Sequence, residues 1–412
     1  MRDINSLKAD IEHQLTQPLE KISVVSLVDL FVGYAYGARA SDIHIEPTET
    51  ALRVRFRIDG LLHDIFEKIK IKKDLHPEII SRIKVLAGLR TDEHLAPQDG
   101  RFRVKVEGMG NFDVRVSIMP TYYGENAILR ILAETQSFTL DTLGFVAKDL
   151  ERVQAAIRKT YGMILANGPT GSGKTTTLYT ILKQLNRPEV SIITIEDPIE
   201  YSLEGTTQIQ VNNETGLTFA NGLRSILRQD PNIVMVGEIR DQETAGIAVN
   251  AALTGHLVLS TLHTNDAATT FPRLTDMGVP PFLVASTVNI AMAQRLVRTI
   301  CEGCKTERVL AKEELKSLGE IIPDVETTSK TVFYIGQGCA ACNQTGYQGR
   351  IGVREVLDVN DEIRQLIMNR ANAAQIKDTA IKNGMITMIH DGLQKALKGI
   401  TTIEEVLRII HE

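Results

Sequence analysis

The feature that most constrains this chain is a glycine-rich stretch at residues 166–178, which reads A-N-G-P-T-G-S-G-K-T-T-T-L. It follows an apolar run at residues 163–165 and precedes a segment with helical character from Thr175 to Leu185. This strand–loop–helix context is the one that a phosphate-binding loop requires. Glycines let backbone N–H groups close around an anion, and the new helix directs its positive dipole end to the same place. The stretch predicts a nucleoside triphosphate site; a glycine-rich turn that binds nothing is the alternative.

The residues of this loop have different expected roles. Lys174 is expected to reach the β- and γ-phosphates, and the Thr175 hydroxyl to hold Mg²⁺. The predicted phosphate-binding set is Gly168, Pro169, Thr170, Gly171, Ser172, Gly173, Lys174, Thr175 and Thr176.

Strands alternate with helices from residue 138 to residue 298, with apolar strands expected at residues 162–167, 191–196, 233–237 and 256–262. This alternation implies a mostly parallel sheet with helices on both faces, in which ligands bind at the carboxyl ends of the strands. Glu200, Glu238 and His263 follow three of these strands. A carboxylate there can orient the attacking water or hold Mg²⁺, and a polar residue beside the γ-phosphate can report its presence. For each one alone, a helix cap, a surface position or a structural role is the alternative.

A smaller α/β domain is expected at residues 21–137, with period-two alternation at residues 42–46 and 52–58. Asp42, His44 and Glu46 share one strand face, for which a solvated or hydrogen-bonded edge is the expectation and a metal site the alternative.

Several arginines lie within the predicted strands of this domain: Arg53, Arg55, Arg57, Arg101, Arg103, Arg115 and Arg130. Most are expected on a wet face, but an arginine from a neighbouring domain or subunit can stabilise γ-phosphate charge by a factor of roughly 10³–10⁵. Residues 1–20 are polar and are expected to be a leader or a linker remnant.

The cysteines form two C-x-x-C pairs: Cys301, Cys304, Cys339 and Cys342. Four thiolates at this spacing suit a structural Zn²⁺, because protein ligands fill every position of a tetrahedron. Disulfides and unliganded thiols are the alternatives. Residues 299–350 are therefore expected to form a small metal-binding segment, and residues 351–412 a helical C-terminal region.

Composition narrows the possible partners. The net charge of −5 gives no overall attraction to nucleic acid or anionic lipid, and the absence of Trp removes one base-stacking platform. The apolar stretch at residues 22–38 is interrupted by Asp29 and has the pattern of an amphipathic helix, too short and polar to span a bilayer. The first residues do not resemble a secretory signal, so a cytoplasmic location is expected.

Four stretches together resemble the secretion-superfamily ATPases, and specifically the type II secretion and type IV pilus assembly motors. They correspond to that family's Walker A motif, aspartate box, Walker B motif and histidine box. They are residues 168–175, 194–201, 227–231 with 236–241, and 254–264. The resemblance extends to the segments 41–46, 57–60 and 97–101 and to the cysteine pairs, and it covers about residues 25–412.

The resemblance implies a RecA-like P-loop core at residues 138–298, preceded by a PAS-like domain at residues 21–137. It implies that Glu238 is the Walker B carboxylate and that Glu200 and His263 complete the γ-phosphate shell. Arg115 and Arg130 match the arginines that the family's N-terminal domain brings onto the nucleotide.

The resemblance also implies a homohexamer that binds ATP, Mg²⁺ and structural Zn²⁺ at the cytoplasmic face of the inner membrane. Hydrolysis would move the two domains against each other and drive pilin or pseudopilin assembly. A membrane platform protein and other components of the machinery would be its partners, the membrane being reached only through them. The alternatives are a DNA-transfer ATPase, a nucleotide-gated scaffold and a pilus retraction ATPase; the last resembles the core but lacks the metal segment.

Overall fold

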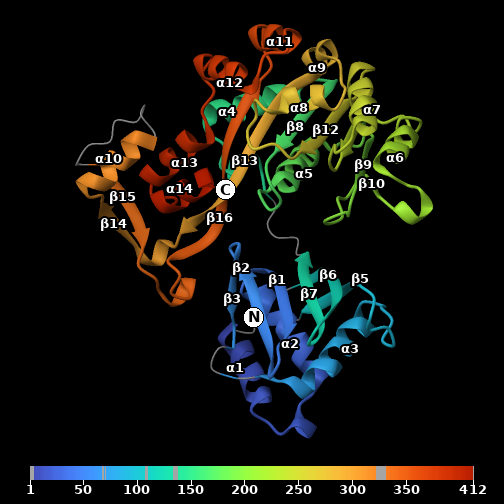
Figure 1. Ribbon diagram of the computed structural model, residues 1–412, viewed down its shortest axis with the longest axis vertical. Helices are drawn as coiled ribbons and strands as arrows, with labels where there is room; N and C mark the ends of the chain where they lie inside the picture. The colour runs from blue at the N-terminus through green and yellow to red at the C-terminus, as the bar shows by residue number, and fades with distance from the viewer. Residues whose placement is uncertain are drawn as a thin grey trace. The chain divides into compact units, whose positions relative to one another are not determined.

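The computed structural model describes residues 4–66, 69, 71–106, 110–132, 138–321 and 331–411. The chain forms two compact units, Met1–Ser137 and Phe138–Glu412 (Figure 1).

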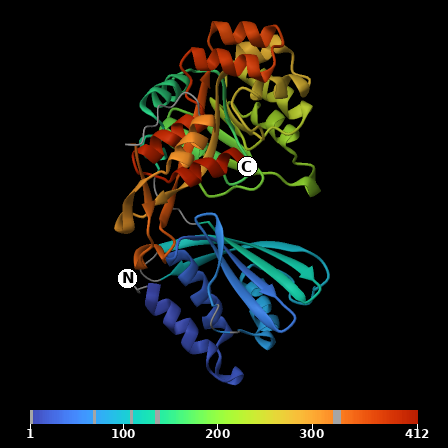
Figure 2. The same cartoon turned by 60° about the vertical axis from the view of Figure 1, so that its left-hand side comes forward.

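The first unit is one antiparallel sheet covered by helices on one face (Figure 2). Its strand order is β3-β2-β1-β7-β6-β5, and β4 also pairs with β2. The strands are β1 (Ala40–Pro47), β2 (Ala51–Ile58), β3 (Leu61–Asp64), β4 (Ile71–Lys72), β5 (Gln98–Val106), β6 (Gly110–Thr121) and β7 (Gly124–Leu132). The helices are α1 (Ile4–Leu15), α2 (Val24–Gly37) and α3 (His76–Leu86). Because side chains alternate along each strand, one sheet face packs against these helices and the other carries the charged residues.

Helix α1 corrects the expectation of a leader or linker at residues 1–20. Leu7, Ile11 and Leu15 recur every fourth residue and are buried in the core of the first unit. Gln14 Nε2 also donates to Ser26 Oγ of α2 at 2.9 Å. Most residues of this segment are polar, and its apolar face is only one residue wide, so the helix was not predicted.

The second unit contains a seven-stranded sheet in the order β10-β9-β11-β12-β8-β13-β16. The strands are β8 (Gly162–Asn167), β9 (Ile192–Glu196), β10 (Thr207–Gln210), β11 (Ile233–Val236), β12 (Leu257–Leu262), β13 (Val288–Ile300) and β16 (Tyr347–Asp358). All neighbours are parallel except β16, which runs antiparallel to β13. The predicted mostly parallel α/β core is confirmed.

Helices cover both faces of this sheet (Figure 1). They are α4 (Ala147–Ile157), α5 (Lys174–Leu185), α6 (Phe219–Ile226), α7 (Gln242–Leu253), α8 (Thr270–Asp276), α9 (Pro281–Thr287), α11 (Asp361–Met368) and α12 (Ala373–Lys382). Strand β8 contributes Met163 and Leu165 to one core cluster and Ile164 and Ala166 to the other. Burial on both sides explains why these strands are apolar runs without alternation.

Strand β16 corrects the expectation that residues 351–412 are helical throughout. Residues 351–358 pair with β13, from Ile290↔Asp358 to Val297↔Ile351, and helices begin only at α11. The expected boundaries at 298/299 and 350/351 fall inside β13 and β16 respectively, so the core sheet crosses them.

The remaining elements surround the cysteines and the end of the chain. Strands β14 (Lys305–Val309) and β15 (Val332–Gly336) form a two-stranded antiparallel sheet beside α10 (Lys312–Ile321), α13 (Met388–Leu397) and α14 (Ile403–His411). None of the helices in the described residues has the length and apolar character needed to cross a membrane.

Candidate active site and metal centre

The glycine-rich loop connects β8 to α5, as the sequence predicts. Gly168 has a φ of 139°, and a Cβ there would lie 2.6 Å from the carbonyl oxygen of Gln294. Gly173 has a φ of 87° and is the N-cap of α5, so no side chain competes for the first N–H groups of this helix. The loop therefore presents backbone donors and a helix dipole to an anion.

Lys174 folds back over this loop. Its Nζ donates to the carbonyl oxygens of Gly168 at 2.7 Å and Pro169 at 2.9 Å. Burial lowers the pKa of Lys174, Glu238 opposes that shift, and Arg295 adds to it. The ammonium group is thus held at the loop, where phosphate oxygens would replace the two carbonyls as its partners.

Glu238 and His263 come together although they follow different strands. They lie beyond β11 and β12, which are parallel neighbours with Val236 opposite Ser260. His263 Nε2 is 3.1 Å from Glu238 Oε2, and Arg240 Nη2 is 2.6 Å from Glu238 Oε1. Strand β12 lies between β11 and β8 and runs parallel to both, so Glu238 and His263 lie at the same edge of the sheet as the phosphate-binding loop that follows β8. Arg240 was not among the predicted site residues, although it lies two positions after Glu238.

Glu200 occupies a different position from this pair. It is half-buried in the loop after β9, and the hydrogen bonds found in the described part of the chain do not join its carboxylate to Glu238. Burial raises the pKa of Glu196, and the charge of Glu200 adds a smaller effect in the same direction.

Glu196 is the buried carboxylate at the end of β9, and only 3% of it is exposed. It accepts hydrogen bonds from the Tyr179 hydroxyl, from Thr194 Oγ1 at 2.6 Å and from Gln208 Nε2 at 3.2 Å. Burial raises the pKa of Glu196, while these donors act in the opposite direction. Glu196 was not among the predicted site residues; the available signal was a carboxylate at the end of a strand that is otherwise apolar except for Thr194.

Arg115 and Arg130 belong to the first unit, whereas the other predicted site residues belong to the second. They lie directly opposite each other on β6 and β7, on the charged face of the sheet. Arg130 Nε is 2.8 Å from Asp42 Oδ1, and Arg57 Nε is 3.6 Å from Asp42 Oδ2.

The Asp42, His44 and Glu46 face forms ion pairs. The Glu46 carboxylate accepts hydrogen bonds from Nε and Nη2 of Arg55, at 2.8 and 2.6 Å. His44 Nδ1 is 3.6 Å from Glu46 Oε1. Asp42 is engaged by Arg130 and Arg57. Within the described residues, the cluster suited to a metal is formed by cysteines and not by this face.

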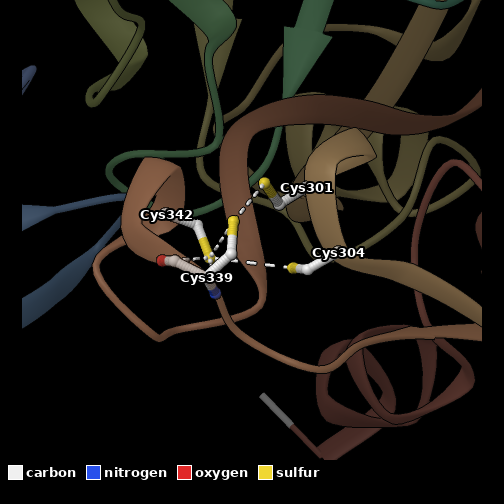
Figure 3. A group of neighbouring side chains, drawn as sticks. All are labelled: Cys301, Cys304, Cys339 and Cys342. Atoms are coloured by element: carbon white, nitrogen blue, oxygen red, sulfur yellow. Dashed lines mark hydrogen bonds between the residues drawn. The ribbon is translucent and has the colours of Figure 1, made fainter.

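The four cysteine sulfurs converge (Figure 3). Cys301 directly follows β13, Cys304 directly precedes β14, and Cys339 and Cys342 lie between β15 and β16. Three Sγ–Sγ distances, 301–339, 304–342 and 339–342, are each 3.8 Å. Sulfurs bound at about 2.3 Å around a tetrahedral Zn²⁺ lie about 3.8 Å apart, whereas a disulfide needs about 2.0 Å. The separation fits a metal centre and excludes disulfides in this conformation.

Backbone groups add to the metal-binding character of Cys342. The N–H groups of Cys339 and Gly346 each donate to its sulfur at 3.2 Å. Burial opposes ionisation of this thiol, but these donors, together with the Cys339 and Cys304 thiols, outweigh it and lower the pKa of Cys342 to about 6. The donor set and its geometry fit Zn²⁺, which binds thiolates.

Comparison with known proteins identifies the family. The model of the type II/IV secretion system protein family matches residues 17–408. The chain belongs to this family. A type II secretion system protein E of Xanthomonas campestris is 49% identical over 393 residues, which are 94% of this chain and 68% of that relative. A type IV pilus assembly ATPase PilB of Myxococcus xanthus is 44% identical over 98% of this chain and 71% of its own length.

Solved structures agree with this assignment. The pilus retraction motor PilT with bound ADP matches with a TM-score of 0.64 and 26% identity, over 92% of this chain and 96% of that one. The Legionella pneumophila ATPase DotB matches with a TM-score of 0.70 and 21% identity, over 96% and 98% respectively, and supports the fold alone. The chain is therefore an ATP-binding ATPase of the secretion and pilus-assembly type, and the predicted family resemblance is confirmed.

Proposed function

We propose that this chain is a homohexameric motor ATPase that powers assembly of a type IV pilus or a type II secretion pseudopilus. In this proposal it works at the cytoplasmic face of the inner membrane, where a platform protein and other components of the machinery are its partners. The observation that carries the catalytic assignment is the convergence of Lys174, Glu238 and His263 at the carboxyl ends of β8, β11 and β12.

Each side chain of the site then has a role. The loop amides and Lys174 bind the phosphates of ATP, and the Thr175 hydroxyl would hold Mg²⁺, which would supply charge neutralisation to the phosphates. Glu238 and Glu200 orient the attacking water. His263, through its contact with Glu238, responds to the γ-phosphate. Zn²⁺ held by the four cysteines has a structural role, because four protein thiolates leave no open coordination position.

The partners of Glu238 reduce the repulsion between its carboxylate and a bound polyphosphate. A carboxylate next to a polyphosphate would repel it, and the repulsion is stronger in a partly buried site. Arg240 and His263 each contact one oxygen of Glu238. Arg240 offsets the negative charge, while the orientation of the carboxylate is retained for polarising water. We infer that Arg240 allows Glu238 to lie near the nucleotide.

Two substitutions test the catalytic assignment. Lys174→Ala should abolish ATP binding and turnover, because it removes the phosphate-binding cation. Glu238→Gln should retain ATP binding but lower kcat by roughly 10²–10⁴, the size of a general-base contribution. Glu243→Gln is a matched control, because Glu243 on α7 forms an exposed ion pair with Arg224. Turnover within a few-fold of wild type for either active-site variant would contradict the assignment.

The arginines of the first unit need a separate experiment. We propose that Arg115 and Arg130 supply positive charge to the γ-phosphate in the transition state. Arg115→Ala and Arg130→Ala should then lower kcat and leave the Kd for ATP unchanged. Arg53→Ala is the control, since Arg53 is on the same sheet and pairs with Asp64. Loss of ATP binding would assign the arginines to ground-state binding instead.

The match to the retraction motor PilT makes a retraction ATPase the second candidate. Deleting the gene in the native cell separates the two functions. Loss of an assembly motor leaves no filaments, whereas loss of a retraction motor leaves filaments that persist. Light scattering of the ATP-bound protein tests the hexamer.

A further inference from the structure

A buried glutamine on β13 contacts the phosphate-binding loop and has no role in the proposed mechanism. Gln294 is 0% exposed. Its Nε2 donates to the carbonyl oxygen of Ser172 at 2.8 Å, and its Oε1 accepts from Thr177 Oγ1 at 2.9 Å. One amide thus joins the last turn of the loop to the first turns of α5.

The sheet register explains why this residue reaches the loop. Ala293 pairs with Asn167, the last residue of β8, so Gln294 lies one position beyond the end of that strand. The loop is packed closely here. A Cβ on Gly173 would lie 3.2 Å from Gln294 Nε2, and one on Gly168 would lie 2.6 Å from the Gln294 carbonyl oxygen. The phosphate-binding loop therefore packs directly against strand β13.

The hydrogen bond to Ser172 has a consequence for the opposite side of the same peptide group. A trans peptide is planar, and its C=O and N–H point in opposite directions. When Gln294 fixes the Ser172 carbonyl, the N–H of Gly173 is directed away from β13. Because Gly173 has a φ of 87° and no side chain, this peptide depends on an outside contact to fix its orientation.

Thr177 fixes the glutamine in turn. A side-chain amide can rotate to exchange its donor and acceptor. The Thr177 hydroxyl donates to Oε1 and so leaves Nε2 facing Ser172. Burial makes both bonds necessary, since a buried polar group without a partner is costly.

We propose that Gln294 is a positioning residue that holds the Ser172–Gly173 peptide with its N–H directed at the β-phosphate of the bound nucleotide. The inference rests on the proposed nucleotide site at this loop. Its ligand class is a nucleoside diphosphate or triphosphate, because the β-phosphate is common to ADP and ATP. The contact exists in the ground state and persists in the transition state, so it contributes to affinity more than to the chemical step.

The test uses Gln294→Met, which keeps the side-chain length and removes both hydrogen bonds. The Kd for ADP and the KM for ATP should each rise about 10-fold, the effect of one lost hydrogen bond to a charged group. The kcat at saturating ATP should stay within about threefold of wild type, as expected when uniform binding is removed. Gln365→Met is the matched control, because Gln365 is exposed on α11.

The substitution Thr177→Val tests the same hydrogen-bond chain without changing any residue of β13. It should raise the Kd for ADP in the same direction, whereas Thr177→Ser, which retains the hydroxyl, should bind ADP like wild type. In the double variant Gln294→Met/Thr177→Val the effects should be less than additive, because both act through one amide. If Gln294→Met does not fold, the Thr177 pair alone decides the matter.

The outcomes separate this inference from the proposed function. Unchanged ADP affinity in Gln294→Met and in Thr177→Val, alongside lost affinity in Lys174→Ala, would overturn the inference and leave the nucleotide site standing. Unchanged affinity in Lys174→Ala would overturn the site itself. A lower Tm for Gln294→Met with an unchanged Kd and KM would mean a purely structural role and would also overturn the inference.

Discussion

A cluster of buried charges in the second unit should be the most sensitive point of its fold. Asp391 on α13 is 1% exposed and accepts both from Lys395 Nζ, at 2.5 Å to each oxygen, and from the backbone N–H of Arg354, at 2.7 Å. Burial lowers the pKa of Arg354 to about 10, and Asp391 opposes that shift. One carboxylate therefore compensates two buried cations and ties α13 to β16.

Asp391→Ala would leave Lys395 and Arg354 buried without this anion. Removing one partner of a buried ion pair costs about 3–5 kcal/mol, because the remaining charge keeps its desolvation penalty. In a unit of this size each kcal/mol lowers Tm by about 2–4 °C, so we expect Tm to fall by about 10 °C. Urea unfolding followed by circular dichroism gives the free energy directly.

Two further variants separate charge from packing. Arg364→Ala removes an exposed ion pair with Asp361 and should cost under about 0.5 kcal/mol. Asp391→Ala/Lys395→Met, which removes a stranded cation as well, should regain part of the loss. A cost below about 1 kcal/mol for Asp391→Ala, or no recovery in the double variant, would refute the electrostatic reasoning.

Three other expectations concern buried polar groups. Burial raises the pKa of Asp149 to about 6, so its contribution to stability is present below pH ~4 and is lost as pH rises through 6. Asp149→Asn should therefore remove about 3 kcal/mol of pH dependence between pH 4 and 7, measured by urea unfolding at both values. Under the proposed zinc assignment, elemental analysis should find about one zinc ion per chain in the unaltered protein and close to none in Cys342→Ser. Tyr179→Phe should destabilise the fold by about 1–3 kcal/mol, because Glu196 loses a donor while remaining buried; equal urea midpoints would contradict this.

The phosphate-binding loop could be predicted because its residues are neighbours in the sequence. A glycine-rich loop between a strand and a helix indicates a phosphate site without help from any distant residue. Glu238 and His263 are 25 residues apart, yet their contact at 3.1 Å follows from the rule that parallel strands end at one edge of a sheet. The convergence of the four cysteines was similarly predictable, because two C-x-x-C pairs supply four sulfurs at the spacing that suits a tetrahedral site.

The parts that were missed depend on distant partners. Strand β13 is buried on both faces, which removes the alternation by which a strand is recognised. Its pairing with β16 joins residues that lie far apart in the sequence. Gln294 reads as an ordinary polar residue, and its partners Ser172 and Thr177 precede it by 122 and 117 residues. Helix α1 was missed for a different reason, since Leu7 and Ile11 supply too few apolar positions to outweigh a polar composition.

The arginines of the first unit show how a structure ranks candidates that spacing cannot distinguish. Most of those on the charged sheet face are held by carboxylates, in the pairs Arg55–Glu46, Arg53–Asp64, Arg103–Asp113, Arg101–Asp113, Arg57–Asp42 and Arg130–Asp42. Across the described residues, no ion pair involves Arg115. The residues directly opposite it on the neighbouring strands are Arg101 and Arg130, and like charges at such positions repel. An incoming phosphate would relieve that repulsion at Arg115, whereas at Arg130 it would have to compete with the buried carboxylate of Asp42. Of the two proposed arginines, Arg115 is therefore the one that can engage a nucleotide without breaking an existing contact.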